Sequence, residues 1–198
     1  MLGVHVMPGT EATPELVKSL EPDVVLSGNG ARSKLPNIPG IDRANVMTAI
    51  EAYKHPEKVT GRVVVIGGGE TGCDTAVYFA MDKGLDVTLI GRNRNLAKDA
   101  GPIAGSALMK HLQEYAKGIY SGTACTAISD KSVTCERYGD IFTVPADTVI
   151  IASGMESLAE EGEQLRGISA EFRRIGDSEK VGNVRTAVRQ GYDAAVQI

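Results

Sequence analysis

The sequence predicts an α/β fold in which short apolar strands alternate with amphipathic helices. The first observation is an apolar run over residues 62–66 that leads directly into a glycine-rich stretch over residues 67–72. The second is a helical repeat of apolar residues that follows this stretch. The third is another apolar run, residues 87–90, directly after that helix. Strand, turn, helix and strand in this order are typical of a βαβ unit with parallel strands.

Composition places the chain among globular proteins and excludes several function classes. Its 198 residues are 42% hydrophobic and 23% charged, which suits one fair-sized domain or two small ones. The net charge of −4 leaves no basic patch for nucleic acid and no polybasic membrane signal, so we expect neither as a partner. No apolar run approaches the roughly 18 to 20 residues of a membrane-spanning helix.

Three cysteines, Cys73, Cys125 and Cys135, are far apart and odd in number. This pattern argues against a disulfide scaffold, a zinc site or a redox Cys-x-x-Cys motif, and it predicts a cytoplasmic protein. Cys73 lies at a helix start, where a lowered thiol pKa is one interpretation. A small buried packing residue is the alternative that we favour, and Cys125 and Cys135 are expected to pack or to lie at the surface.

The segment before the glycine-rich stretch predicts a strand, a helix and a second strand. Residues 3–7 form the first candidate strand, and Thr13 with Pro14 marks a helix start. Residues 23–27 form the second strand candidate, and residues 35–42 an irregular connection. Without a glycine fingerprint of its own, this segment is not expected to form a complete nucleotide site.

The central and C-terminal parts contain the remaining predicted elements. Thr48 and Glu51 have the spacing of a capping box, and Gly84 is the expected C-terminal cap of the helix after residue 72. Further along, we expect a helix over 102–117, an antiparallel meander of three short strands, a buried strand ending at 154, an exposed loop or frayed helix over 156–167, a strand over 172–177 and a helix over 183–198. The meander strands are residues 125–128, 132–136 and 141–144.

The glycine-rich stretch has the GxGxxG spacing of a dinucleotide-binding turn in a Rossmann-like domain. The first glycine permits the tight turn, the second lets backbone approach a pyrophosphate, and the third lets the helix pack on the strand. Helix N–H groups and the helix dipole then favour the phosphates. For Glu70 the alternatives are an exposed or capping residue and one facing the nicotinamide; for Thr71 they are a phosphate contact and a helix-start residue. The candidate cofactor-binding residues here are Gly67, Gly68, Gly69, Glu70, Thr71 and Gly72.

The residues after the second strand indicate which nucleotide is bound. An NAD site usually has a carboxylate there for the ribose hydroxyls, but this chain has Gly91 followed by Arg92 and Arg94. Two guanidiniums could pair with a 2′-phosphate, which favours NADP(H) over NAD(H). A solvated basic loop is the alternative. No general acid or base stands out, which agrees with hydride transfer, where the cofactors supply the chemistry.

Four stretches together resemble a known family. They are residues 10–17, 23–26 and 35–42 and the sequence GGGETGCDTA at residues 67–76. The chain resembles, over nearly its whole length, the C-terminal region of NADH:flavin oxidoreductases of the Old yellow enzyme superfamily, of the 2-enoate reductase and 2,4-dienoyl-CoA reductase type.

The resemblance implies an NAD(P)-binding domain inserted into a FAD-type domain. Residues 56–155 would form the NAD(P)-binding domain with its β-meander, and residues 1–55 and 156–198 would be pieces of a second, FAD-type Rossmann-like domain. The resemblance also implies that Gly154 lies near the cofactor and that Gly176 and Asp177 belong to a motif whose Asp contacts the flavin. The final helix would point its N-terminus at the FAD pyrophosphate.

Two departures from the family pattern shape the functional expectation. Residues 28–30 are Gly-Asn-Gly where the family usually has Ala-Thr-Gly. The first βαβ unit of the FAD domain, the N-terminal FMN-binding barrel and the cysteines for a 4Fe–4S cluster are not in the sequence. We therefore expect a fragment whose partner is the N-terminal flavin barrel domain of the same enzyme.

The resemblance leads to one main functional hypothesis and two alternatives. In the intact enzyme, hydride would pass from NAD(P)H to FAD for reduction of an enoate or similar acceptor, while the isolated chain would bind nucleotide without turnover. The alternative is a stand-alone, non-catalytic nucleotide-binding module that pairs with a flavoprotein subunit. A thioredoxin-reductase-like activity is disfavoured because Cys-x-x-Cys is missing.

Overall fold

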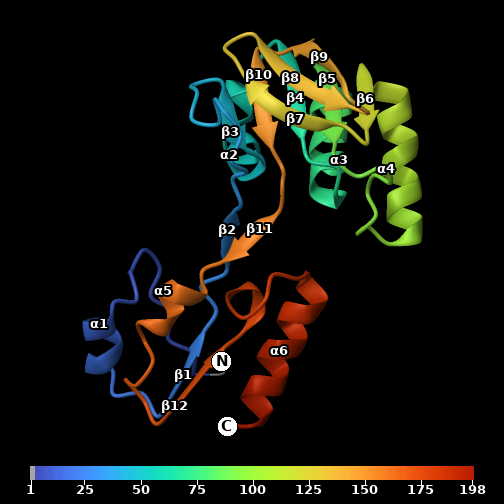
Figure 1. Cartoon of the computed structure of the whole chain (residues 1–198). Helices are drawn as coiled ribbons and strands as arrows, with labels where there is room; N and C mark the ends of the chain where they lie inside the picture. Colours follow the sequence, from blue (N-terminus) through green and yellow to red (C-terminus); the bar gives the residue numbers. More distant parts are fainter. Residues whose placement is uncertain (1–2) are drawn as a thin grey trace. The chain divides into compact units, whose positions relative to one another are not determined.

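The computed structural model describes residues 3–198, which form two compact units (Figure 1). Unit 2 is the continuous segment Ser33–Gly154. Unit 1 combines the residues up to Arg32 with Met155–Ile198. The chain therefore leaves unit 1, forms all of unit 2 and returns. β2 (Ala31–Ser33) and β11 (Met155–Ser157) pair as a small sheet where the chain passes between the units.

A five-stranded parallel sheet is the centre of unit 2. Its order is β3-β10-β4-β5-β6, and every neighbouring pair is parallel. Four of the five residues of β4 and all four of β10 are buried, as expected for central strands covered on both faces. The bounds are β3 (Val46–Thr48), β4 (Arg62–Ile66), β5 (Asp86–Gly91), β6 (Gly118–Ser121) and β10 (Thr148–Ile151).

Helices cover one face of this sheet and the meander covers the other (Figure 1). Because side chains alternate along a strand, Val63 and Val65 pack with the helices, whereas Val64 packs with the meander. The helices are α2 (Ala49–Lys54), α3 (Glu70–Val77) and α4 (Pro102–Tyr115), with 3-10 turn η1 (Pro56–Lys58) and π-helical segment η2 (Tyr78–Asp82). The meander is antiparallel, with strands β7 (Ala124–Ile128), β8 (Ser132–Arg137) and β9 (Asp140–Pro145).

Unit 1 contains a two-stranded parallel sheet and short helices. β1 (Val24–Ser27) pairs with β12 (Glu171–Arg174). The helical segments are α1 (Pro14–Ser19), α5 (Ala159–Glu163), η3 (Gly176–Ser178) and α6 (Val184–Val196). Helix α6 is strongly amphipathic, but its apolar stripe is exposed; the stripe consists of Val184, Val188, Tyr192 and Val196.

The predicted helix caps are confirmed. The Thr13 hydroxyl accepts from the backbone N–H of Leu16, with Pro14 in the first turn of α1. Thr48 and Glu51 form the reciprocal capping box of α2. Gly84 follows the end of η2 with φ of 65°, as a C-terminal glycine cap requires.

Several predicted elements differ from the structure. Residues 3–7 form no strand. Residues 156–167, predicted as an exposed loop or a frayed helix, contain the end of β11 and the short helix α5. Strands β2, β3, β6 and β11 were not predicted; each has three or four residues and no run of more than two apolar residues. The compact unit begins at Ser33, and β3 belongs to it because β3 pairs with β10; the division into NAD(P)- and FAD-type domains stays a prediction.

Candidate functional site

The glycine turn lies at the carboxyl end of β4, between that strand and α3. Gly67 has φ of 144°, and a Cβ there would overlap the carbonyl oxygen of Ala152. A Cβ on Gly72 would overlap the carbonyl oxygen of Gly67, so the absence of a side chain lets α3 pack directly on the turn. The first and third glycines therefore have the steric roles expected of a dinucleotide-binding turn. Ala152 also donates its N–H to the Ile66 carbonyl (2.8 Å), which ties β10 to the end of β4.

A carboxylate already lies against the first turn of α3. The backbone N–H of Glu70 donates to Oδ1 of Asp99 over 2.7 Å. A Cβ on Gly69 would lie 3.0 Å from Oδ2 of the same side chain. The N–H groups and the dipole at a helix N-terminus favour an anion at this position. Asp99 occupies it, and no pattern in the sequence had indicated this residue.

The loop after β5 holds Asp99 in place by packing on the glycine turn. The N–H of Ala97 donates to the Gly68 carbonyl over 2.8 Å, and Leu96 lies against Gly68 and Gly91. Gly68 therefore provides the backbone surface on which this loop rests. Gly69 is the N-cap residue of α3 and has no side chain of its own that could cap the helix.

Arg92 and Arg94 lie on this same loop and are exposed. The structure places the Arg94 guanidinium 5.2 Å from the ring centre of Tyr138, which follows β8. The residue that ends β5 is Gly91, so no side-chain carboxylate stands at that strand end.

Three candidate residues predicted from the family resemblance lie outside the turn. Gly154 has φ of 104°, and its carbonyl accepts from the N–H of Lys34 (2.9 Å). It belongs to unit 2, two residues after the Ala152 that contacts Gly67. Gly176 and Asp177 belong to unit 1, in η3 before α6. There the Gly176 N–H donates to Gln190 Oε1 (2.6 Å), and Asp177 Oδ1 accepts from the N–H of Gly182 (2.9 Å).

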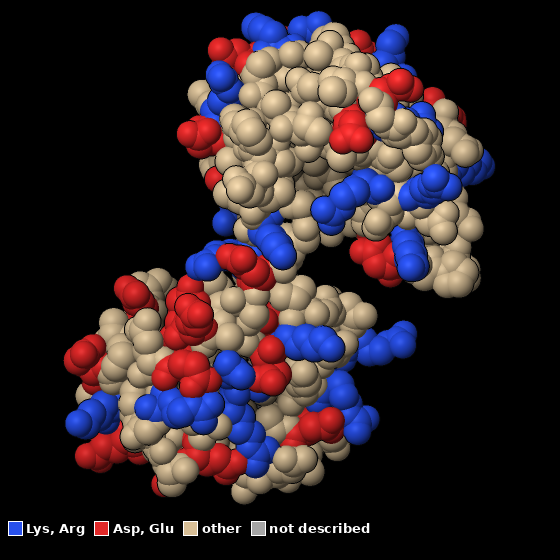
Figure 2. All heavy atoms as spheres, viewed as in Figure 1, with Lys and Arg blue, Asp and Glu red and all other residues tan. Residues whose placement is uncertain are grey.

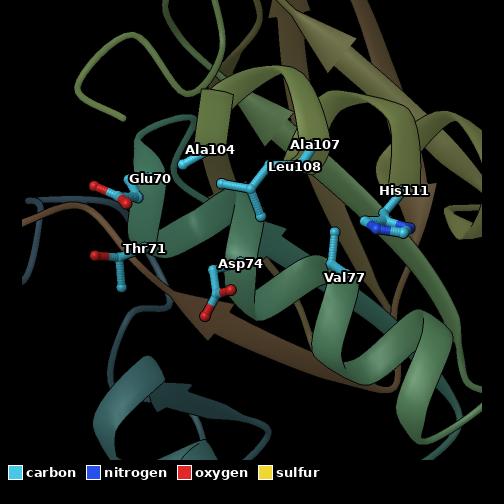
Figure 3. Close-up of a pocket in the computed structure, with 8 residues that line it drawn as sticks. All are labelled: Glu70, Thr71, Asp74, Val77, Ala104, Ala107, Leu108 and His111. Atoms are coloured by element: carbon cyan, nitrogen blue, oxygen red, sulfur yellow. The ribbon is translucent and has the colours of Figure 1, made fainter. Parts of the chain in front are cut away.

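A groove of about 610 Å³ runs between α3 and α4 and shares Glu70 and Thr71 with the turn (Figure 3). It extends to the end of α3, away from the strand ends where the turn lies. The other lining residues are Asp74, Val77, Ala104, Ala107, Leu108 and His111. Sequence reasoning did not single out Asp74, whose carboxylate accepts from the Tyr53 hydroxyl (3.0 Å). Burial raises the pKa of that hydroxyl to about 12, so Tyr53 remains a donor at neutral pH.

The cysteines are packing residues rather than nucleophiles. Cys73 is fully buried, and burial raises the pKa of its thiol to about 11. The interpretation of a lowered Cys73 pKa is therefore wrong, because the apolar core outweighs the helix start. Burial likewise raises the pKa of Cys125 to about 11 and of Cys135 to about 12.

Residues 3–198 offer neither a metal centre nor a membrane span. No group of three or more His, Cys, Asp or Glu within this range is placed to hold a metal ion. No helix in this range is both long and apolar enough to cross a bilayer. On the face shown in Figure 2, acidic and basic side chains are interspersed over both units.

Comparison with known proteins places the chain in a family. Residues 10–166 match the model for pyridine nucleotide-disulphide oxidoreductases. The chain is 30% identical to a bilirubin reductase from Mediterraneibacter gnavus over 98% of its length, and 31% identical to an NADH oxidase from Thermoanaerobacter brockii over 99%. It spans 30% and 31% of these two relatives.

A solved structure agrees with this assignment. A 2-naphthoyl-CoA reductase, captured with 2-naphthoyl-CoA, superimposes with a TM-score of 0.89 over 96% of this chain and 29% of its own, at 27% identity. The match confirms the Rossmann-like α/β fold with a parallel sheet. Because the family model covers most of the chain, this protein belongs to the pyridine nucleotide-disulphide oxidoreductase family.

Proposed function

We propose that unit 2 binds NADPH or NADH, with the pyrophosphate at the glycine turn. The observation that carries this proposal is the Asp99 carboxylate at the start of α3. An N–H donor of the turn already holds an anion there at 2.7 Å, so the local geometry suits a phosphate oxygen. Gly67 and Gly72 allow the backbone to make this turn, and a side chain on either would overlap a carbonyl oxygen.

Different residues around the turn would contact different parts of the nucleotide. Gly68 and Gly69 present backbone to the pyrophosphate, and Thr71 offers a hydroxyl in the first turn of α3. Glu70 and Gly154 lie where the nicotinamide half would leave the turn. At the end of β5, Arg92 and Arg94 would face the adenosine ribose, where two guanidiniums favour a 2′-phosphate and hence NADPH.

We propose further that unit 1 contributes to a flavin site in the intact protein. Gly176, Asp177 and the N-terminus of α6 would face FAD, which supplies the hydride acceptor for the nicotinamide C4. The chain's own role is to bind and orient the nucleotide, and no side chain in the site is needed to move a proton. The similarity to a bilirubin reductase and to a 2-naphthoyl-CoA reductase supports a conjugated acceptor such as an enoate.

The chain spans about 30% of its relatives, so activity and substrate belong to the proposed whole protein. In that protein an N-terminal barrel with FMN and a 4Fe–4S cluster would receive the electrons. This part of the proposal rests on the family resemblance described above.

Titration of the full chain with NADPH and NADH tests the nucleotide proposal. We expect both to bind, and Arg92→Glu to weaken NADPH more than NADH. Lys110→Glu in α4 is the matched control, because Lys110 is also an exposed cation of unit 2 and forms no ion pair among residues 3–198. No binding of either nucleotide at millimolar concentration would contradict the proposal. Equal effects of Arg92→Glu on both nucleotides would remove only the NADPH preference.

A further inference from the structure

Two arginines beside the end of β5 have no carboxylate partner. Neither Arg94 nor Arg137 forms an ion pair with any of residues 3–198, although arginine usually does so elsewhere in this chain. The paired arginines are Arg32, Arg43, Arg62, Arg166, Arg173, Arg174 and Arg189. Arg92 and Arg185 also form no ion pair among these residues, so the missing counter-ion singles out Arg94 and Arg137 only because the two lie against one ring.

One aromatic ring joins these two arginines. The guanidinium carbon of Arg94 lies 5.2 Å from the centre of the Tyr138 ring, and that of Arg137 lies 5.4 Å from it. Both distances are within the range of a cation–π contact. Tyr138 has φ of 55° at the turn between β8 and β9, and it remains 65% exposed. It is therefore accessible to a ligand while both cations lie against it.

The chain brings this cluster to the carboxyl edge of the parallel sheet. The N–H of Gly122, just after β6, donates to the Asn93 carbonyl after β5 (3.1 Å). A Cβ on Gly122 would lie 3.2 Å from the Tyr138 hydroxyl and 3.3 Å from Cγ of Arg94. The meander turn therefore packs against the loops after β5 and β6, at the strand end proposed for the ribose.

Arg137 also has a donor without an acceptor. Its Nε is buried and has no hydrogen-bond partner among the described residues. Leaving a charged donor buried and unpaired is costly, and so is placing two guanidiniums on one ring without an anion. A phosphate would supply the missing counter-ion of the two guanidiniums, because guanidiniums bind phosphate oxygens in a bidentate fork.

We infer that Arg137 and Tyr138 of the meander complete a site for the ribose 2′-phosphate of NADPH. Arg94 and Arg137 supply the two guanidiniums, and Tyr138 is a positioning residue that holds them together. This inference rests on the proposed nucleotide function and extends it, because it assigns nucleotide selectivity to the meander as well as to the loop after β5. The meander would then both cover one face of the sheet and distinguish NADPH from NADH.

The test measures the affinity of the full chain for NADPH, NADH, 2′,5′-ADP and 5′-AMP. NADPH differs from NADH, and 2′,5′-ADP from 5′-AMP, only by the 2′-phosphate. We expect Arg137→Gln to weaken NADPH and 2′,5′-ADP about 10-fold, with NADH and 5′-AMP unchanged. Tyr138→Leu should lower the affinity for the same two ligands about 3-fold. Tyr138→Phe should keep the wild-type affinity, because the ring face is retained. Lys110→Gln in α4 is the charge-matched control, because it removes one exposed positive charge from the same unit.

The outcomes separate this inference from the function on which it rests. If the wild-type chain binds NADH and NADPH but Arg137→Gln weakens both equally or neither, the meander site is overturned and the nucleotide proposal stands. If Tyr138→Leu has no effect on the NADPH to NADH ratio, the positioning role is overturned. If the wild-type chain binds none of the four ligands, both proposals fail. Unchanged NADH affinity in each variant shows that the variant is folded.

Discussion

The two units of this chain differ sharply in how they bury apolar surface. Unit 2 contains two hydrophobic clusters, one on each face of its five-stranded sheet. In the described part of unit 1 the buried hydrophobic residues are Val25 and Ala194, and α6 exposes its whole apolar stripe. The glycine turn lies on the well-packed unit. The glycine turn that we propose as the nucleotide site therefore shares a unit with the larger hydrophobic core, while unit 1 leaves the apolar face of α6 exposed.

The largest expected effect on stability comes from truncating the sheet core. Leu89 of β5 is fully buried, so Leu89→Ala should lower the free energy of unfolding by about 2 to 5 kcal/mol. Val188→Ala, on the exposed stripe of α6, should change it by less than about 0.5 kcal/mol. Urea unfolding followed by circular dichroism measures both. Similar losses for the two variants would break the contrast between the units.

A glycine substitution should have opposite signs in the two units. Gly72→Ala places a Cβ against the Gly67 carbonyl, so it should cost about 1 to 3 kcal/mol of stability and abolish detectable NADPH binding. Gly191→Ala, in the interior of α6, meets no atom within 4 Å and should stabilise by about 0.5 to 1 kcal/mol through helix propensity. Thermal unfolding and nucleotide titration check the pair. Tolerance of alanine at position 72 would contradict the close helix packing.

Acid should act on unit 2 through Asp147. Hydrogen bonds from Arg62 hold the pKa of the Asp147 carboxyl well below its ordinary value and join the starts of β4 and β10. Because this pKa is depressed in the folded state, the contribution is present above about pH 4 and is lost as the pH falls below it. Asp147→Asn should therefore reduce the difference in urea midpoint between pH 7 and pH 3. If Asp147→Asn left this difference in urea midpoint unchanged, the Arg62–Asp147 pair would not contribute to the pH dependence of stability.

The smallest predicted effect concerns Asp99. Its carboxylate competes with a pyrophosphate for the N–H of Glu70, so Asp99→Asn should tighten NADPH binding about 2- to 5-fold. The same change should cost about 0.3 to 1 kcal/mol of stability, because it removes an anion from the N-terminus of α3. Nucleotide titration measures the change in NADPH affinity, and thermal unfolding measures the change in stability. Weaker binding in this variant would show that Asp99 supports the nucleotide rather than competing with it.

The sequence predicted most elements that have strong periodicity or capping. β4, α3 and β5 follow from one continuous pattern, and the meander follows from turn residues between alternating strands. Prediction from the sequence failed for strands that form only because they pair with a neighbouring strand. β3 and β6 are three and four residues long and exist because they pair with β10 and β5. The apolar residues of 3–7 form no strand, since none of the described strands pairs with them.

The site could be predicted only as far as residues adjacent in sequence. The glycine turn is local, so its steric roles follow from the spacing of Gly67 and Gly72. Asp99 and Tyr138 reach the site through tertiary packing of a loop and a hairpin, and nothing in the sequence pattern indicates it. Cys73 shows the same limit, because its thiol pKa depends on the surrounding core rather than on its place in the helix.

Hydrogen exchange of the full chain, measured by mass spectrometry with and without NADPH, tests directly whether unit 2 holds both the stable core and the nucleotide site. Without nucleotide, amides of β4, β5 and β10 should exchange far more slowly than those of β12 and α6, because exchange reports local stability. With NADPH, new protection should appear at residues 67–72 and in the loop after β5. Equal protection of the two units, or nucleotide-induced protection confined to unit 1, would show that stability and nucleotide binding are not combined in unit 2.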